Sequence, residues 1–171
     1  YLSWKAREYD FYTKFIELAA EVNSAMPYHL VDLVANALAS HQKALRGARL
    51  VVLGVAFKKD VDDARNSPAE RLIELSLARG ADVVYHDPYV PQFHIGPDVF
   101  HPEVQVLDSQ PLSEDLLINS DAVVIVSGHS QLDYGWVVRH APLVVDGPNA
   151  TKGIREGLNK VWRVGAPPPC C

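Results

Sequence analysis

The 171 residues are 48% hydrophobic and 22% charged, which is the composition of a globular chain long enough to bury a core. A formal net charge of -5 gives no long-range attraction for nucleic acid or for an anionic membrane surface, so we expect neither as a partner. No apolar run approaches the roughly 20 residues of a membrane span and no signal-like segment opens the chain, so we expect a cytoplasmic protein.

A long helix, or two helices in series, is the first element that the pattern predicts, over residues 12–45. Apolar side chains recur there in steps of three and four, at Phe15, Ala19, Val22, Met26, Leu30, Leu33 and Ala37. Pro27 falls inside this pattern, and an interior proline removes a backbone hydrogen bond. We therefore predict a bend between Asn23 and Pro27.

A second apolar row makes the stripe of this helix wider than one neighbouring surface needs. It comprises Leu18, Val31, Val34 and Leu38. The helix therefore packs on its own domain or forms an interface between two subunits, and the pattern leaves both open. In the second case, we expect charged residues in place of Leu30 and Leu33 to convert a dimer into monomers.

Strands and helices alternate after this helix. The β-branched run at residues 50–55 is typical of a strand buried on both faces. Ser67 and Pro68, with a glutamate three residues after the serine, predict the start of a helix that leads into a second strand at residues 82–86. Residues 91–111 hold four prolines, so we expect mostly loop there, with a possible short strand over the four residues from Val104.

Further helices are expected at residues 113–119 and 134–140, with strands at 122–126, 143–146 and 160–164. This alternation predicts an α/β fold in which a doubly wound, mostly parallel, Rossmann-like sheet follows the long, kinked N-terminal helix. We expect three parts: central linker or dimerisation helices in residues 1–46, the α/β domain in 47–165, and a flexible tail in 166–171. Cys170 and Cys171 lie in that tail, where we expect them to have no function.

The loop after the first strand, residues 54–67, is where an open α/β sheet binds ligands. Its single glycine, Gly54, excludes the glycine-rich fingerprint of a self-sufficient NAD site. The loop carries three cations and three carboxylates, and Lys58 or Arg65 would complete a phosphate site at the N-terminus of the next helix. The alternative is a solvated loop whose acids and bases satisfy one another, and the spacing does not decide between them.

Other chemistry has little support in the sequence. Asp87 ends the second strand, where an acid binds ribose in dinucleotide folds, but without the glycines we prefer a structural Asp-Pro turn. The histidines show no metal-binding spacing, so we expect no metal. Residues 127–130 lack the pattern of a nucleophile elbow, and we interpret them as a loop at the end of a strand, beside the same cleft.

Five blocks of residues stand out by their order and spacing. They are Tyr1-Leu2-Ser3-Trp4-Lys5-Ala6, Glu21-Val22-Asn23, Leu53-Gly54-Val55-Ala56-Phe57-Lys58-Lys59, Asp62-Asp63-Ala64-Arg65-Asn66-Ser67-Pro68 and Asp87-Pro88-Tyr89. Together they resemble the UDP-glucose/GDP-mannose dehydrogenase family from Tyr1 to about Ile154. The segment from Ser3 to Tyr9 is most like the branch that acts on UDP-N-acetyl-hexosamines, such as the glucosamine and mannosamine forms.

The resemblance implies the C-terminal part of an enzyme that oxidises C6 of a nucleotide sugar to a carboxylate with two NAD, for surface polysaccharides. In this family an N-terminal domain holds NAD, a long central helix forms the homodimer, and the C-terminal domain covers the UDP-sugar. The family's catalytic cysteine precedes the position matched by Tyr1, so we expect no catalytic residue in this chain and no activity of the chain alone. The opposing hypothesis is a stand-alone nucleotide-binding or dimerisation module without catalysis.

Residue by residue, the resemblance implies three contacts. Phe57 and Lys58 match substrate-contacting residues, and Arg65 matches an arginine that faces the cofactor and substrate across the cleft between domains. Pro148 departs from the family, because many relatives have an arginine at this position. That contact is therefore lost, or Arg155 replaces it.

Overall fold

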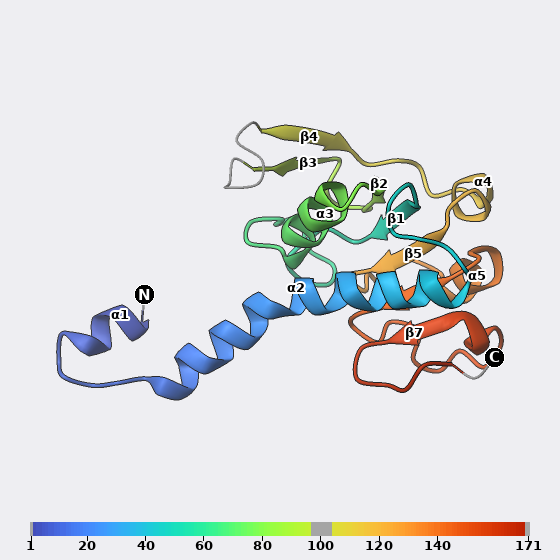
Figure 1. Ribbon diagram of the computed structural model, residues 1–171. Coiled ribbons are helices and arrows are strands. Elements are labelled where there is room, and N and C mark those ends of the chain that lie inside the picture. The colour runs from blue at the N-terminus through green and yellow to red at the C-terminus, as the bar shows by residue number, and fades with distance from the viewer. Residues whose placement is uncertain (1, 97–103, 170–171) are drawn as a thin grey trace.

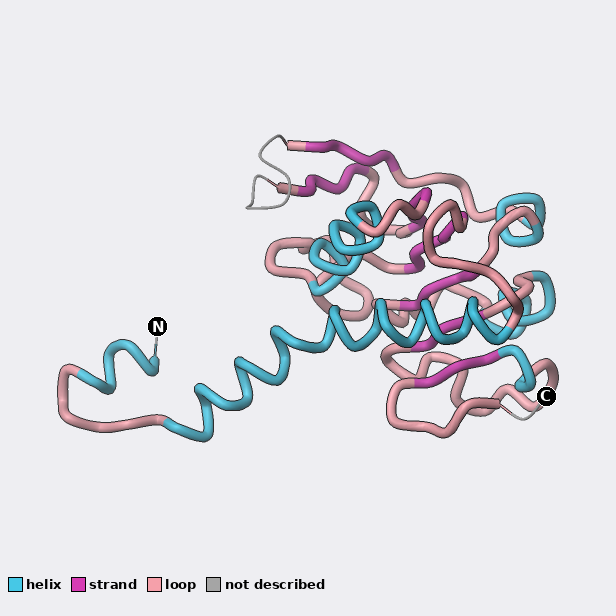
Figure 2. The backbone as a smooth tube through the Cα atoms, in the orientation of Figure 1, coloured by secondary structure: helices cyan, strands magenta, loops and turns pink. Residues whose placement is uncertain are grey.

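Two helices open the chain, and the second is its longest element. The computed structural model describes residues 2–96 and 104–169, with α1 at Leu2–Arg7 and α2 at Lys14–Ser40. Pro27 lies inside α2, and the helix runs through it without a break. The tube and ribbon views show that α2 changes direction part-way along its length, as an interior proline requires (Figures 1 and 2).

Five parallel strands form the central sheet. They are β1 (Arg49–Leu53), β2 (Asp82–His86), β5 (Ala122–Ile125), β6 (Val144–Asp146) and β7 (Val161–Arg163), in the spatial order β2-β1-β5-β6-β7. The chain leaves β1 for a neighbour on one side and later places β5 on the other side of β1. The point between β1 and β5 is therefore a topological switch point, beside which ligands bind in open α/β sheets.

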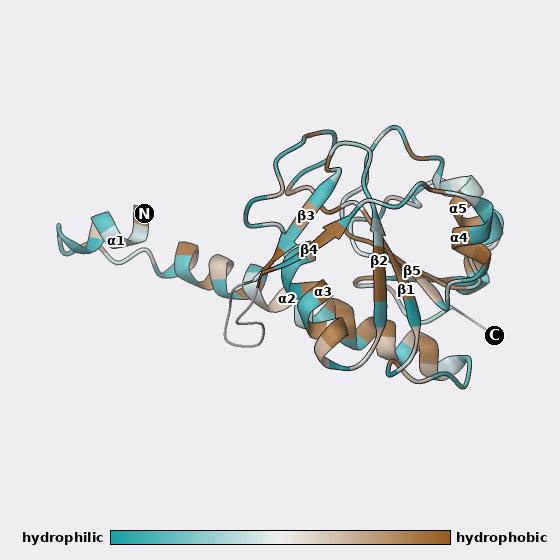
Figure 3. Ribbon diagram, turned by 90° about the horizontal axis from the view of Figure 1, so that it is seen from above, coloured by the Kyte–Doolittle hydropathy of each residue, from teal (hydrophilic) through white to brown (hydrophobic). Residues whose placement is uncertain are grey.

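Helices cover both faces of this sheet, which confirms the predicted α/β class. On one face, α2 and α3 (Pro68–Ala78) pack on Leu50 and Val52 of β1. On the other face, α4 (Glu114–Ile118) and α5 (Tyr134–His140) pack on Val51 and Leu53. Successive residues of a strand point to opposite faces, so one uninterrupted apolar run supplies two cores. In Figure 3, the brown of hydrophobic residues marks the strands and the part of α2 that adjoins them.

The two halves of α2 have different surroundings. In the C-terminal half, Leu30, Val31, Val34, Ala37 and Leu38 are buried in the core beneath the sheet. The apolar residues of the N-terminal half are exposed, and this half projects with α1 away from the sheet (Figure 1). The C-terminal half of α2 therefore packs on its own domain, and the subunit interface stays a prediction for the exposed N-terminal half. Leu30 is 7% exposed and belongs to the chain's own core, so its position fits the first interpretation and it is a poor site for testing the second.

A hairpin replaces part of the expected loop over residues 91–111, and its second strand confirms the short strand expected from Val104. Gln92–Ile95 form β3, which pairs antiparallel with β4 (Gln105–Asp108). Phe93 and Ile95 alternate with exposed neighbours and are buried, Phe93 against the ring of Tyr85 at 6.0 Å between centroids. The frequent prolines hid this two-residue periodicity. The part of the expected loop from residue 97 to 103 lies outside the described residues.

The start of α3 follows the sequence prediction. Ser67 is the N-cap, its side chain accepts a hydrogen bond from the Ala69 N–H, and Pro68 begins the helix. A short 3₁₀ helix, Leu158–Lys160, precedes β7. None of the helices within the described ranges is long and apolar enough to cross a membrane. Cys170 and Cys171, predicted to lie in a tail, are outside those ranges.

Candidate functional site

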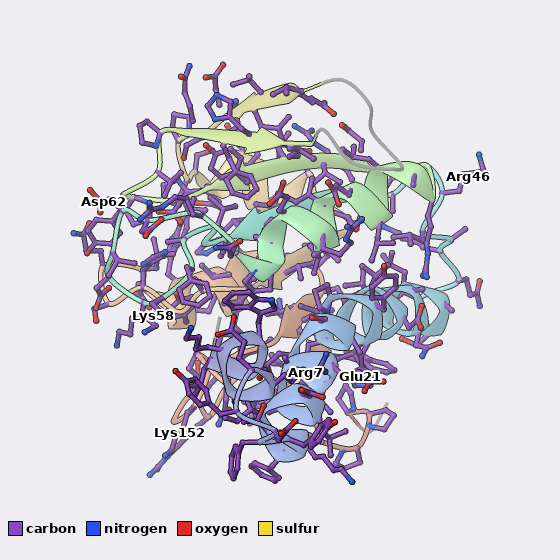
Figure 4. The ribbon with its side chains drawn as sticks, turned by 90° about the vertical axis from the view of Figure 1, so that its left-hand side faces the viewer. Arg7, Glu21, Arg46, Lys58, Asp62 and Lys152 are labelled. Atoms are coloured by element: carbon purple, nitrogen blue, oxygen red, sulfur yellow. The ribbon has the colours of Figure 1, made fainter. Side chains whose placement is uncertain are left out.

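Loops that follow the strands gather at one edge of the sheet. Figure 4 shows Lys58 and Asp62, from the loop after β1, on the same side of the molecule as Lys152, from the loop after β6. Arg46 precedes β1 and lies at the opposite side in this view. Lys58, which the sequence singled out, therefore lies with Asp62 and Lys152 at the carboxyl ends of the strands, where an α/β sheet binds its ligands.

The loops after β1 and β5 are in direct contact. Gly54 has a φ of +79°, and a Cβ added to it would stand 2.3 Å from the carbonyl oxygen of Ser127. The Ser127 hydroxyl also donates a hydrogen bond to the carbonyl of Ala56. The glycine after β1 thus serves the close approach of Ser127. Ser127 occupies the space beside Gly54 in which the pyrophosphate of a dinucleotide would have to lie. The residues of this chain therefore do not form a complete NAD site.

The Asp87 carboxylate binds the backbone at the start of the same loop. One carboxylate oxygen accepts hydrogen bonds from the N–H groups of Val55 and Ala56, at 2.7 and 3.0 Å. The other accepts from the N–H groups of Tyr89 and Val90, at 2.8 and 3.1 Å. The structural Asp-Pro turn is confirmed, and Asp87 also holds the loop after β1.

His129 connects Asp87 to the middle of the loop. The ring is fully buried, with Nε2 3.0 Å from the Asp87 carboxylate and Nδ1 accepting a hydrogen bond from the Asp60 N–H at 3.0 Å. Because the N–H of Asp60 can only donate, Nδ1 is the unprotonated nitrogen and Nε2 carries the hydrogen. His129 therefore joins the loops after β1, β2 and β5 through one side chain.

Asp60 has a left-handed backbone, with φ at 60°. Its carboxylate accepts hydrogen bonds from the backbone N–H and from the hydroxyl of Ser130, both at 2.7 Å. These two bonds, the backbone one first, lower the pKa of Asp60. Since a left-handed non-glycine residue persists only where its surroundings hold it, His129 and Ser130 keep this turn in place.

A cavity of about 540 Å³ separates this loop from the two helices, and we call it the helix cavity. Its lining residues come from α2, from the loop and from α3: Asn23, Ser24, Met26, Pro27, Phe57, Asn66, Pro68 and Arg71. An apolar cavity of about 190 Å³ adjoins it, sharing Met26, Pro27 and Pro68 and reaching Pro148. The volume of the helix cavity is within the range of small-molecule sites.

Two further hollows open beside the loop. One, of about 490 Å³, lies between the loop and β3, and its lining includes Arg65 and His94. The other, of about 500 Å³, lies beside the loops after β5 and β6, and its lining includes Lys59, Ser130 and Asn149. The loop after β1 therefore contributes residues to three separate cavities.

The fold and the site have counterparts among known proteins. A family model described as the UDP-glucose/GDP-mannose dehydrogenase family, UDP binding domain, matches residues 51–153, which is more than half of the chain. The chain belongs to the UDP-glucose/GDP-mannose dehydrogenase family. The matched range begins in β1 and contains the loop after it, both loops that contact that loop, and Pro148.

Individual relatives agree with this membership. The chain is 31% identical to UDP-glucose 6-dehydrogenase AglM of Haloferax volcanii, over 90% of this chain and 34% of the relative. Among solved structures, it resembles a UDP-D-ManNAc dehydrogenase from Pyrococcus horikoshii, with a TM-score of 0.69 and 25% identity over 88% of this chain and 33% of that one. It also resembles an NDP-N-acetyl-D-galactosaminuronic acid dehydrogenase from Methanosarcina mazei, with a TM-score of 0.68 and 33% identity over 86% and 31%. The chain spans about a third of the length of these relatives.

The residues that the family resemblance singled out lie at different cavities. Phe57 lines the helix cavity and is 48% exposed, and the Lys58 Nζ lies 5.6 Å from the centre of its ring. Arg65 lies at the β3 side, with its side chain 86% exposed and bound through two nitrogens to Asp63 at 2.9 and 2.8 Å. The structure therefore brings Phe57 and Lys58 together and separates Arg65 from the helix cavity.

The pair of Arg65 and Asp63 supports part of the solvated-loop interpretation. Hydrogen bonds from Arg65 lower the pKa of Asp63 to about 2, and the same pair raises the pKa of Arg65. Lys58 differs, because no carboxylate within the described ranges lies at ion-pair distance from it. Acids and bases thus neutralise one another at one end of the loop and not at Lys58.

Arg71 and His129 are the residues that sequence reasoning did not single out. Arg71 lines the helix cavity from α3, and only its position three residues after the predicted helix start pointed to it. His129 was interpreted as part of a strand-end loop, and nothing in its spacing showed that it would contact Asp87, 42 residues away in sequence. Within the described ranges, no group of three or more His, Cys, Asp or Glu side chains is placed to hold a metal.

Proposed function

We propose that this chain is the nucleotide-sugar-binding part of an NAD-dependent UDP-sugar 6-dehydrogenase. Family membership and the names of the relatives support an oxidation of a UDP-sugar. The UDP-N-acetyl-hexosamine branch is favoured by the opening residues and by relatives named UDP-N-acetyl-D-mannosamine dehydrogenase, one of them 30% identical over 80% of this chain. Residues 47–165 would bind the sugar nucleotide, and residues 1–46 would link and dimerise the subunits in the cytoplasm.

The placement of Phe57 and Lys58 carries this proposal. Phe57 lines the helix cavity at the carboxyl end of β1, beside polar side chains from Asn23 and Asn66. An aromatic face and amide groups suit a base and ribose, and the Lys58 ammonium at the adjoining rim suits a phosphate. The bonds from Asp87 and His129 to the loop keep these groups in position before a ligand arrives.

Arg65 has a separate role in this proposal. It faces the cavity at the β3 side, so we assign it to the NAD-facing surface of the loop. NAD is the hydride acceptor of the reaction. We place its main binding site outside residues 1–171, because Gly54 packs on Ser127 and does not open a pyrophosphate site. No residue of this chain is assigned to catalysis, so the 171-residue chain alone should not reduce NAD.

Titration calorimetry with UDP tests the proposal. Lys58→Gln should weaken UDP binding by roughly 10-fold or more, because a charge-assisted hydrogen bond to phosphate is lost. Lys152→Gln is the matched control, since Lys152 is also exposed on this side of the molecule, and it should leave the affinity unchanged. Failure of the unchanged chain to bind UDP, or equal losses in the two variants, would contradict the proposal.

A further inference from the structure

We propose that Arg71 joins Lys58 in holding the diphosphate of the nucleotide, with Arg71 binding it inside the helix cavity. This inference rests on the proposed function, because it concerns the same ligand. Arg71 lies near the start of α3, four residues after the N-cap Ser67, and it lines the cavity from this helix. The other described lining residues are uncharged, so the positive charge of this cavity comes from Arg71.

A buried carboxylate holds Arg71 in place. Glu74, one turn further along α3, is 2% exposed, and its Oε2 lies 2.9 Å from the Arg71 Nη1. The helix backbone between the two residues is fixed, because Leu72 and Ile73 are buried in the core. A long side chain that is already ordered loses little conformational freedom when a ligand binds.

The chemistry of the guanidinium fits a diphosphate better than a lysine does. It carries five N–H donors in a planar fork, so it can hold a carboxylate on one side and phosphate oxygens on another. The Arg71 side chain is 34% exposed, which places it between solvent and core. Its interaction with an anion is therefore screened less than that of a fully exposed cation at the rim.

The rest of the cavity suits the remaining parts of a nucleotide. Asn23 and Ser24 offer hydrogen-bonding groups from α2, and Asn66 offers an amide from the loop. Asn66 has a left-handed backbone, with φ at 57°, which turns the chain toward α3 at this point. Phe57 presents an apolar ring at the same cavity. Polar groups, one aromatic ring and one anchored cation together match a nucleoside diphosphate.

A purely structural role for Arg71 is the competing explanation, since a buried glutamate requires a partner. Replacing Arg71 alone would leave Glu74 unpaired and would confound binding with unfolding. The informative variant is therefore the double substitution Arg71→Gln with Glu74→Gln, which replaces the ion pair by two neutral amides. Arg71→Lys is the second variant, because it keeps the charge for Glu74 and removes the fork.

Binding of UDP and of uridine to the 171-residue chain separates these explanations. We expect the double variant to bind UDP at least about 10-fold more weakly than the unchanged chain, with uridine binding within about 2-fold. Arg71→Lys should show a smaller loss for UDP alone, and Glu74→Gln alone should retain most of the UDP affinity. Thermal unfolding confirms that each variant is folded.

Two results would overturn the assignment of Arg71, and they differ in what they say about the proposed function. Unchanged UDP affinity in the folded double variant, or in Arg71→Lys if the double variant does not fold, rejects Arg71 and leaves the proposed function intact. Absence of UDP binding by the unchanged chain rejects both.

Discussion

The sheet buries its apolar side chains, whereas α1 and the first half of α2 leave theirs exposed. In β5, each of the four residues is fully buried, and helices cover both faces. In the turn after α1, Tyr9 is 75% exposed, and in the first half of α2, Phe15 is 83% exposed. The chain therefore supplies a complete core for its sheet and leaves an apolar surface on its N-terminal helices. A change in the first region should act on stability, and a change in the second should act on association.

Asp87→Ala gives the largest expected effect on the sheet region. The substitution removes the buried carboxylate that accepts hydrogen bonds from four backbone N–H groups and from the His129 ring. A buried donor left without its acceptor costs about 1–3 kcal/mol, so the loss of several such bonds should lower the free energy of unfolding by at least about 3 kcal/mol. Urea unfolding followed by circular dichroism measures this difference in the free energy of unfolding.

Asp82→Ala is the matched control for Asp87→Ala. Asp82 starts the same strand, β2, and is exposed, so its replacement should change the free energy of unfolding by less than about 0.5 kcal/mol. Similar losses in both variants would show that the network around Asp87 contributes no more than an ordinary surface residue.

Local pattern predicted most of the sheet region. The five strands, the Ser67 cap and the Asp-Pro turn each arise from residues that are close together in the sequence. They could therefore be predicted from the sequence. The β3–β4 hairpin was missed at β3 because its partner strand is distant and prolines surround it. At the site, Phe57 and Lys58 were placed together by family resemblance, whereas the contact of His129 with Asp87 arises only when the chain folds.

Charged residues on the exposed half of α2 give the next largest effect, on association. We expect Phe15→Glu and Val22→Glu each to weaken self-association by roughly 10-fold or more, because a large apolar side chain would be lost from a dimer contact. The midpoint of thermal unfolding should change little, since both residues are exposed in this chain. Sedimentation velocity over a range of concentrations measures the dimer fraction.

Ala20→Glu is the control for these two variants. Ala20 is exposed and lies two residues before Val22, which is more than half a turn around the helix, so it faces away from the same stripe. It adds the same charge and should leave the dimer fraction unchanged. A monomeric parent chain, or equal effects at Ala20 and Val22, would remove the case for dimerisation through this half of α2.

The smallest expected effect is the contribution of the Asp63–Arg65 pair to stability. The titration of Asp63 tests whether this pair orders the exposed loop. Hydrogen bonds from Arg65 lower its pKa from 3.8 to about 2, so the pair favours the folded state above pH 3.8 and loses this contribution as the pH falls through about 2. We expect the carboxyl carbon signal of Asp63 in an NMR titration to have its midpoint near pH 2, and Arg65→Gln should return that midpoint to the ordinary value of an aspartate. The neighbouring Asp62 serves as the internal reference, because it makes no such pair with Arg65. An ordinary midpoint for Asp63 in the unchanged chain would show that Arg65 is free of it in solution and therefore available to a ligand without competition.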